Sequence, residues 1–181
     1  MGLEELRNDC AVKQKRGLHF ILASVIIWLL VMAIHLTSWP IMTKNFFTFC
    51  ATAPLMPLAF LISKLIGVDF QNKGNPLTNL GIFLSAGQVL YLLIAMWIYP
   101  TVPDKMVMII AMIFGAHLLP FSWLYQSKSY MVFAILIPFL SLLLGIYFQP
   151  YVLAMAMVGV EILFSLCLAA EVRAGKMTAR A

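Results

Sequence analysis

Apolar residues are grouped in six long runs, separated by short connections that hold most of the polar residues. Each run is close to the roughly 20 residues that a helix needs to cross a bilayer. The strand-like alternation of apolar and polar residues is absent, so the pattern predicts an all-α polytopic membrane bundle and not a β-barrel. The six expected transmembrane helices are Leu18–Thr37, Phe46–Gly67, Thr78–Tyr99, Met106–Tyr125, Tyr130–Phe148 and Tyr151–Val172.

The connections between these runs are too short for a second folded unit, and they carry residues that end helices. Pro40, the Gly74-Asn75-Pro76 turn, Pro100 with Pro103, and Pro150 mark them. We therefore expect residues 1–181 to form a single integral membrane domain.

The composition agrees with this class of protein. Hydrophobic residues make up 63% of the chain and charged residues only 10%, against about 45–50% and about 25% in ordinary soluble domains. This excludes a soluble globular protein, a disordered chain and a nucleic-acid-binding domain, although the net charge is +5. The lipid bilayer is the expected partner, and no nucleic acid is expected to bind.

Basic residues are distributed unequally between the two sides of the predicted bundle. Ten of the twelve Lys and Arg residues fall in the two tails and in the second and fourth connections, which share one side. Only Lys44 and Lys105 fall on the other side. Because positive residues are retained on the inner side of a membrane, both termini are predicted to be cytoplasmic.

Two segments of the chain are similar to each other. Residues 33–54 and 116–138 both contain His-Leu, then Ser-Trp, then Lys, an aromatic residue and Pro. If they are repeats, the half-repeats are 18–99 and 106–172, each with three helices, in the 3+3 inverted arrangement common in transporters. Chance similarity between apolar segments is the alternative, and both interpretations stay open.

Polar residues in the membrane interior are the strongest indication of function. Gln88, His117 and Glu161 fall near the bilayer centre on three different helices, and a carboxylate at that depth costs about 2.5–3.5 kcal/mol. Ser85 and Ser165 lie on small, polar stripes of the same helices as Gln88 and Glu161. These five residues are candidates for a substrate or ion path. The alternative is that each one hydrogen-bonds a neighbouring helix and serves packing alone.

Prolines inside the predicted helices add a second indication. Pro54, Pro57 and Pro138 are expected to break or kink the second and fifth helices, and Pro120 removes a backbone donor one turn after His117. Broken helices at matched repeat positions point to a binding site, whereas isolated kinks are tolerated in ordinary membrane helices.

Motifs for cofactor or metal chemistry are absent from the sequence. It contains no Walker A loop, HExxH, CxxC or GxSxG pattern. Cys10, Cys50 and Cys167 are scattered and odd in number, so they indicate neither a disulfide framework nor a metal site. We expect no cofactor and no bound metal, and no catalytic residue can be assigned.

The stretch from Phe114 to Lys128, FGAHLLPFSWLYQSK, resembles a group of small six-span bacterial membrane proteins of unknown function. The resemblance implies a multi-pass protein of the bacterial cytoplasmic membrane. It implies no particular chemistry.

Three functions fit these observations. The first is a small permease or channel-like protein in which Gln88, His117 and Glu161 handle a small solute or a proton. The second is an intramembrane lipid-modifying enzyme with His117 as base or acid, oriented by Glu161. The third is a non-catalytic accessory subunit of a membrane complex. A homodimer or a larger complex is compatible with each.

Overall fold

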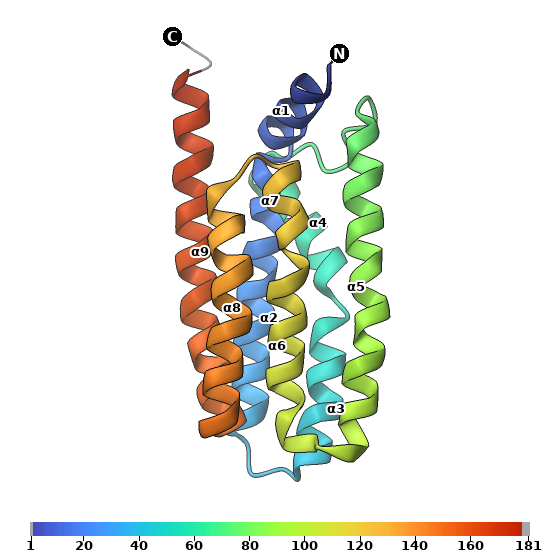
Figure 1. The fold of residues 1–181 in the computed structure, drawn as a ribbon, viewed down its shortest axis with the longest axis vertical. Coiled ribbons are helices and arrows are strands. Elements are labelled where there is room, and N and C mark those ends of the chain that lie inside the picture. The colour runs from blue at the N-terminus through green and yellow to red at the C-terminus, as the bar shows by residue number, and fades with distance from the viewer. Residues whose placement is uncertain (1, 179–181) are drawn as a thin grey trace.

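A computed structural model describes residues 2–178 of the chain. Figure 1 shows a bundle of helices whose long axes run side by side. No strand occurs in this part of the chain, which confirms the all-α prediction. The elements are α1 (Leu3–Lys13), η1 (Lys15–Gly17), α2 (Leu18–Leu36), α3 (Ile41–Thr52), α4 (Leu55–Leu65), α5 (Pro76–Thr101), η2 (Pro103–Lys105), α6 (Met106–His117), α7 (Leu119–Leu124), α8 (Lys128–Tyr147) and α9 (Pro150–Thr178).

The long helices match the predicted spans closely. Within the described residues, five helical stretches are long and apolar enough to cross a membrane, and the bent pair α3 and α4 makes a sixth if it counts as one span. Helix α1 and the end of α9 lie at the same end of the bundle (Figure 1), which we call the terminal end. This is the arrangement that an even number of spans requires.

The spans follow one another around a ring. Helix α2 packs on α4 and α9, α9 packs on α8, α8 on α6, and α6 on α5. The ring is incomplete between α4 and α5, which make at most marginal contact. Helix α5 is the least buried span, with 11% of its apolar stretch inside the protein. Helix α5 therefore forms one side of the bundle and packs less closely on the other helices than the other continuous spans do.

Two of the spans are interrupted. Helices α3 and α4 meet at Pro54 with a bend of 42°, as the sequence predicts, because proline has no N–H to donate to the preceding turn. Helices α6 and α7 meet at Leu118, two residues before Pro120. Pro138 lies inside the continuous helix α8, so the two breaks do not occupy matching positions in the two predicted half-repeats. The repeat itself stays a prediction.

The N-terminal tail contains a helix that the sequence pattern did not predict. Residues Leu3–Lys13 form the helix α1, which lies across the terminal end. Its signals are local: the Gly2 backbone N–H donates to Glu5 at 2.9 Å, and Asp9 and Lys13 form an ion pair at 2.7 Å one turn apart. Such capping and i,i+4 pairs stabilise a short helix.

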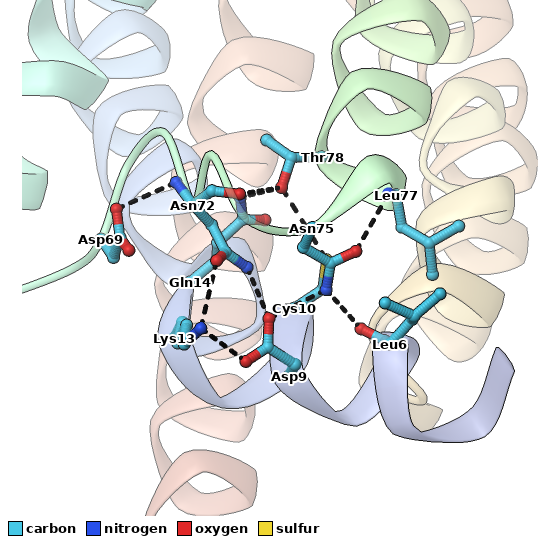
Figure 2. Close-up of polar contacts among 10 residues, drawn as sticks. All are labelled: Leu6, Asp9, Cys10, Lys13, Gln14, Asp69, Asn72, Asn75, Leu77 and Thr78. Atoms are coloured by element: carbon cyan, nitrogen blue, oxygen red, sulfur yellow. Dashed lines mark hydrogen bonds and ion pairs between the residues drawn. The ribbon is translucent and has the colours of Figure 1, made fainter. Parts of the chain in front are cut away.

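Helix α1 is attached to the turn before α5 by a polar network, which we call the α1 latch: Asp9, Cys10, Lys13, Asn72, Asn75 and Thr78 (Figure 2). Asn72 and Asn75 each donate a side-chain N–H to Asp9 Oδ2 at 2.9 Å. Asn75 also donates to the Leu6 backbone oxygen at 2.7 Å and accepts from the Leu77 N–H at the start of α5. The latch therefore ties the loosely packed α5 to the rest of the protein.

Protonation of Asp9 opposes the latch. The hydrogen bond from Lys13, together with those from Asn72 and Asn75, lowers the pKa of Asp9 from 3.8 to about 2, although burial acts in the other direction. A lowered folded-state pKa means that the contribution to stability is present above pH 3.8 and is lost as the pH falls through about 2. Pulsed EPR distances between spin labels on α1 and α5 should therefore stay narrow down to about pH 4 and broaden near pH 2.

Cys10 provides a direct measure of latch opening at neutral pH. Its side chain is fully buried, next to Thr78, and burial raises the pKa of its thiol. In a protein whose other two cysteines are replaced by serine, we expect Asp9→Ala to speed maleimide labelling of Cys10 about tenfold, because charge-assisted hydrogen bonds are lost. The control is Asn8→Ala, which changes an exposed residue of the same helix. Equal labelling rates in the two variants would show that Asp9 does not hold α1 in place.

Candidate intramembrane site

A cavity of about 420 Å³ lies in the interior of the bundle. Its walls come from α2, from both sides of the α3–α4 break, from α5, and from both sides of the α6–α7 break. Cavities of about 300–1,000 Å³ accommodate small organic molecules. Both helix breaks therefore border one space of the size that a small ligand occupies.

The cavity lining is mainly apolar and aromatic, with a few polar groups. The ring-bearing residues include Phe20, Trp28, Phe49, Phe114 and Phe121. Between residues 2 and 178, no Asp, Glu, Lys or Arg lines the cavity. Its polar residues are Ser24, Thr52, Ser85, Gln88, His117, Tyr125 and Tyr130.

His117 is positioned by the break between α6 and α7. The Leu118 N–H bonds to the Gly115 oxygen at 3.1 Å, a shorter-range bond than the α-helical one. This leaves the Phe114 oxygen to interact with His117 Nδ1 at 2.6 Å. A carbonyl oxygen only accepts, so Nδ1 carries the proton. In the neutral ring, Nε2 then has a lone pair, and Nε2 makes no hydrogen bond with any group in the described part of the chain.

Helix α5 places Ser85 and Gln88 on the cavity wall. The Ser85 hydroxyl donates to the Gly81 oxygen one turn earlier, at 3.0 Å. The half-buried Gln88 amide makes no hydrogen bond to another described residue. Its donor and acceptor are both available to a molecule in the cavity.

The cavity reaches the outer surface of the bundle between α4 and α5. Met56 at the start of α4 and Val89 on α5 line it, and they are 49% and 63% exposed. The two helices make at most marginal contact with each other. Toward the end opposite the termini the gap is closed, because Tyr99 of α5 donates to the Met42 oxygen of α3 at 3.2 Å. The opening therefore lies on the side of the bundle, among the apolar positions of the candidate spans.

Glu161 does not line the cavity, but it contacts a residue that does. Ser24 Oγ lies 2.7 Å from the Ile21 oxygen and also hydrogen-bonds Glu161 Oε2. A hydroxyl has one proton and donates to one of these oxygens. Both contacts are hydrogen bonds when Ser24 donates to Ile21 and a protonated Glu161 donates to Ser24. The geometry therefore favours an uncharged Glu161.

The buried surroundings of Glu161 fit the same state. Its side chain is fully buried between α9 and α2, and among the described residues Oε1 has no hydrogen-bond partner. Ser165, one turn further along α9, is also buried and lacks a partner in that part of the chain. A charged carboxylate would pay more for an unpaired oxygen than a neutral one.

The structure thus divides the five residues predicted from the sequence. Ser85, Gln88 and His117 line one cavity. Glu161 is one hydrogen bond away from it, through Ser24, and Ser165 lies outside it. Within the described residues, Glu161 and His117 do not hydrogen-bond each other as the sequence predicts: Glu161 pairs with Ser24, and His117 pairs with the Phe114 oxygen.

Sequence reasoning missed Ser24 and Trp28 as site residues. The position of the Ser24 hydroxyl inside the first span could have indicated a site residue. Its partner Glu161, however, is 137 positions away in the chain and could not be identified from the sequence. Trp28 is buried and lines the cavity. In residues 2–178, no three His, Cys, Asp or Glu side chains are grouped as a metal site.

Residues 3–171 match DUF7010, a family of unknown function, and the chain belongs to this family. No curated protein matches the chain, and no solved structure matches it.

The uncharged state of Glu161 can be tested by substitution. We expect Glu161→Gln to leave the melting temperature in detergent close to the wild-type value, because a carboxamide also donates to Ser24 Oγ. Ser24→Ala should cost about 1–3 kcal/mol, since Glu161 then loses its partner inside the protein. The control is Ser141→Ala, which removes a buried hydroxyl of α8 whose contact is Met157 sulfur.

The comparison that decides is between two variants of the same residue. If Glu161→Gln melts as early as Glu161→Ala, a proton on the carboxyl is not what holds the pair together.

Proposed function

We propose that this DUF7010 protein binds a small uncharged molecule inside the membrane and acts as a carrier for it. The proposal rests chiefly on one observation: among the described residues, no Asp, Glu, Lys or Arg lines the cavity, which opens sideways between α4 and α5. Burying a charge in such a site without a partner is costly, so the site favours neutral ligands.

The access route follows from the packing of α5. A molecule dissolved in the bilayer meets the opening beside Met56 and Val89 without crossing the polar ends of the bundle. Helix α5 is held at one end by the α1 latch and at the other by α3. Between these two attachments it packs on α6 and not on α4, so a small displacement of α5 away from α4 would widen the opening.

This proposal makes the permease hypothesis more specific, because it assigns roles to the polar residues in and near the cavity. Gln88 and His117 supply the polar contacts, and Glu161 acts through Ser24 and not by touching the ligand. A path for a free proton or metal ion has less support, because the cavity offers no charged side chain. We also propose that the terminal end faces the cytoplasm of a bacterial plasma membrane, on the strength of the Lys and Arg distribution.

An intramembrane enzyme is the second candidate, and one observation favours it. His117 Nδ1 is held by a backbone carbonyl, which leaves Nε2 facing an open cavity as a general base would be. The two candidates differ in what becomes of the bound molecule. Mass spectrometry of the lipid extract, after incubation with a bound probe, would show an unchanged probe for a carrier and a converted one for an enzyme.

Trp28 allows binding to be measured from inside the cavity. With Trp39, Trp97 and Trp123 replaced by phenylalanine, Trp28 is the sole tryptophan. In lipid nanodiscs, we expect 4-bromobiphenyl to quench its fluorescence saturably, because bromine quenches at short range and the cavity holds a limited number of molecules. Quenching that stays linear in probe concentration would contradict the proposal.

Two neighbouring residues of α5 provide matched variants. Ser85 lines the cavity and Ala86 is exposed on the outer face of the same helix. Ser85→Phe should fill the cavity and weaken binding at least about tenfold, a loss of roughly 1.4 kcal/mol, whereas Ala86→Phe should leave it unchanged. Equal effects of the two substitutions would place the probe on the surface of α5.

A further inference from the structure

We infer that the ligand is a neutral ring compound with a hydrogen-bond donor, of the phenol or ring-alcohol type. The inference rests on the proposed function and makes it more specific. It is drawn from two properties of the cavity: the direction in which its polar groups are already committed, and the continuity of its aromatic wall.

Most of the hydroxyl groups that line the cavity already donate their proton to a backbone oxygen of the protein. Thr52 donates to the Phe49 oxygen at 2.8 Å, and Ser85 donates to the Gly81 oxygen at 3.0 Å. The Ser24 hydroxyl donates to the Ile21 oxygen and accepts from the protonated Glu161. What these three hydroxyls can still offer a ligand is an oxygen lone pair.

His117 adds a fourth acceptor to this set. Its Nδ1 proton goes to the Phe114 oxygen, which leaves the Nε2 lone pair of the neutral ring. The uncommitted donors of the cavity are the two Gln88 amide N–H groups, the Trp28 indole N–H and the Tyr130 hydroxyl, whereas the oxygens of Gln88, Tyr125 and Tyr130 add three acceptors to the four above. The lining is therefore richest in acceptors, and a ligand that donates a proton satisfies more of it than one that only accepts.

The aromatic residues form a connected wall beside His117. The Trp28 and Phe114 rings meet edge to face at 6.4 Å between centroids, Phe114 lies 5.7 Å from the His117 ring, and that ring lies 5.8 Å from Phe121. Phe121 continues the wall to Tyr125 and Tyr130, at 6.0 Å and 6.2 Å. Flat rings gain from stacked or edge contacts with such a surface, beyond the gain from burial.

These features together exclude several classes of ligand. Phosphate or carboxylate headgroups lack a counter-charge in the lining. An alkane satisfies none of the acceptors. A ring with a hydroxyl places the ring on the aromatic wall and the hydroxyl on His117 Nε2, and it needs no charged partner.

The test uses three brominated probes of similar shape, each titrated in nanodiscs into the protein with Trp28 as its sole tryptophan. They are 4-(4-bromophenyl)phenol, its methyl ether, and 4-(4-bromophenyl)benzoate. We expect the phenol to bind about five- to tenfold more tightly than the ether, because one neutral hydrogen bond is lost in the ether. The benzoate should bind most weakly.

His117→Phe should remove the preference for the phenol while the ether still binds. The matched control is His19→Phe: His19 is buried on α2, lies outside the cavity lining, and has no hydrogen-bond partner in the described residues. It should keep the preference. Ser85→Ala and Thr52→Ala should also keep the preference, because the single phenol proton goes to His117 Nε2. The comparison of the phenol with the ether at the unaltered site does not depend on the folding of His117→Phe.

The outcomes separate the two proposals. Saturable binding of the phenol and the ether with equal affinity would overturn the ligand class and leave the carrier proposal standing. Tightest binding by the benzoate would overturn the ligand class as well. Failure of all three probes, and of 4-bromobiphenyl, to bind saturably would overturn the carrier proposal itself. A preference that survives His117→Phe would show that His117 Nε2 does not accept the hydroxyl proton.

Discussion

A helix in a bilayer must satisfy its backbone hydrogen bonds within the protein, and the cavity exists where two helices do not do so in the regular way. Pro54 and Pro120 each lack the N–H that the preceding turn would use. The backbone groups released near them are taken up by side chains: Thr52 bonds the Phe49 oxygen, and His117 bonds the Phe114 oxygen. These side-chain hydrogen bonds satisfy backbone oxygens near the helix breaks, and they also fix the orientation of Thr52 and His117 in the cavity.

The weak attachment of α5 has a related consequence. A span that packed evenly on both neighbours would close the ring and bury Val89. Instead α5 rests on α6 and is tied at its ends, by the α1 latch and by the contact of Tyr99 with α3. A gap remains at the level of the breaks and not at the level of the connections. Polar residues therefore anchor the helix near the membrane surfaces, where water and headgroups are close, and the opening lies between the anchors.

Much of this architecture could be predicted from the sequence, because membrane thickness and backbone satisfaction act on composition alone. The spans, their breaks at proline and the depth of Gln88, His117 and Glu161 all follow from counting along the chain. Rotation about the helix axis does not, so the sequence could not tell that Gln88 and His117 share a cavity while Glu161 faces α2. Pro138 shows a second limit of the sequence: a proline alone does not tell whether a helix breaks, because helix α8 continues through Pro138 without interruption.

Helix α1 was missed for a different reason. Its residues are polar, and polarity in a membrane protein indicates only that a segment lies outside the bilayer. Its capping and its Asp9–Lys13 pair are local, but the contacts that hold it against the bundle, chiefly with Asn72 and Asn75, are distant in sequence. Such pairings become visible only when the turn before α5 is placed.

The separation of Glu161 from the cavity is what gives the cavity its neutral character. A carboxyl group on the wall would attract cations and water and would compete with an apolar ligand. Here Glu161 is enclosed between α2 and α9, and Ser24 lies between Glu161 and the cavity. Because the Ser24 proton is already donated, Ser24 can only accept a hydrogen bond from a ligand. The polar residues of the membrane interior thus belong to two adjacent environments. One is closed and holds two helices together. The other opens on the side of the bundle, and no Asp, Glu, Lys or Arg of the described residues lines it.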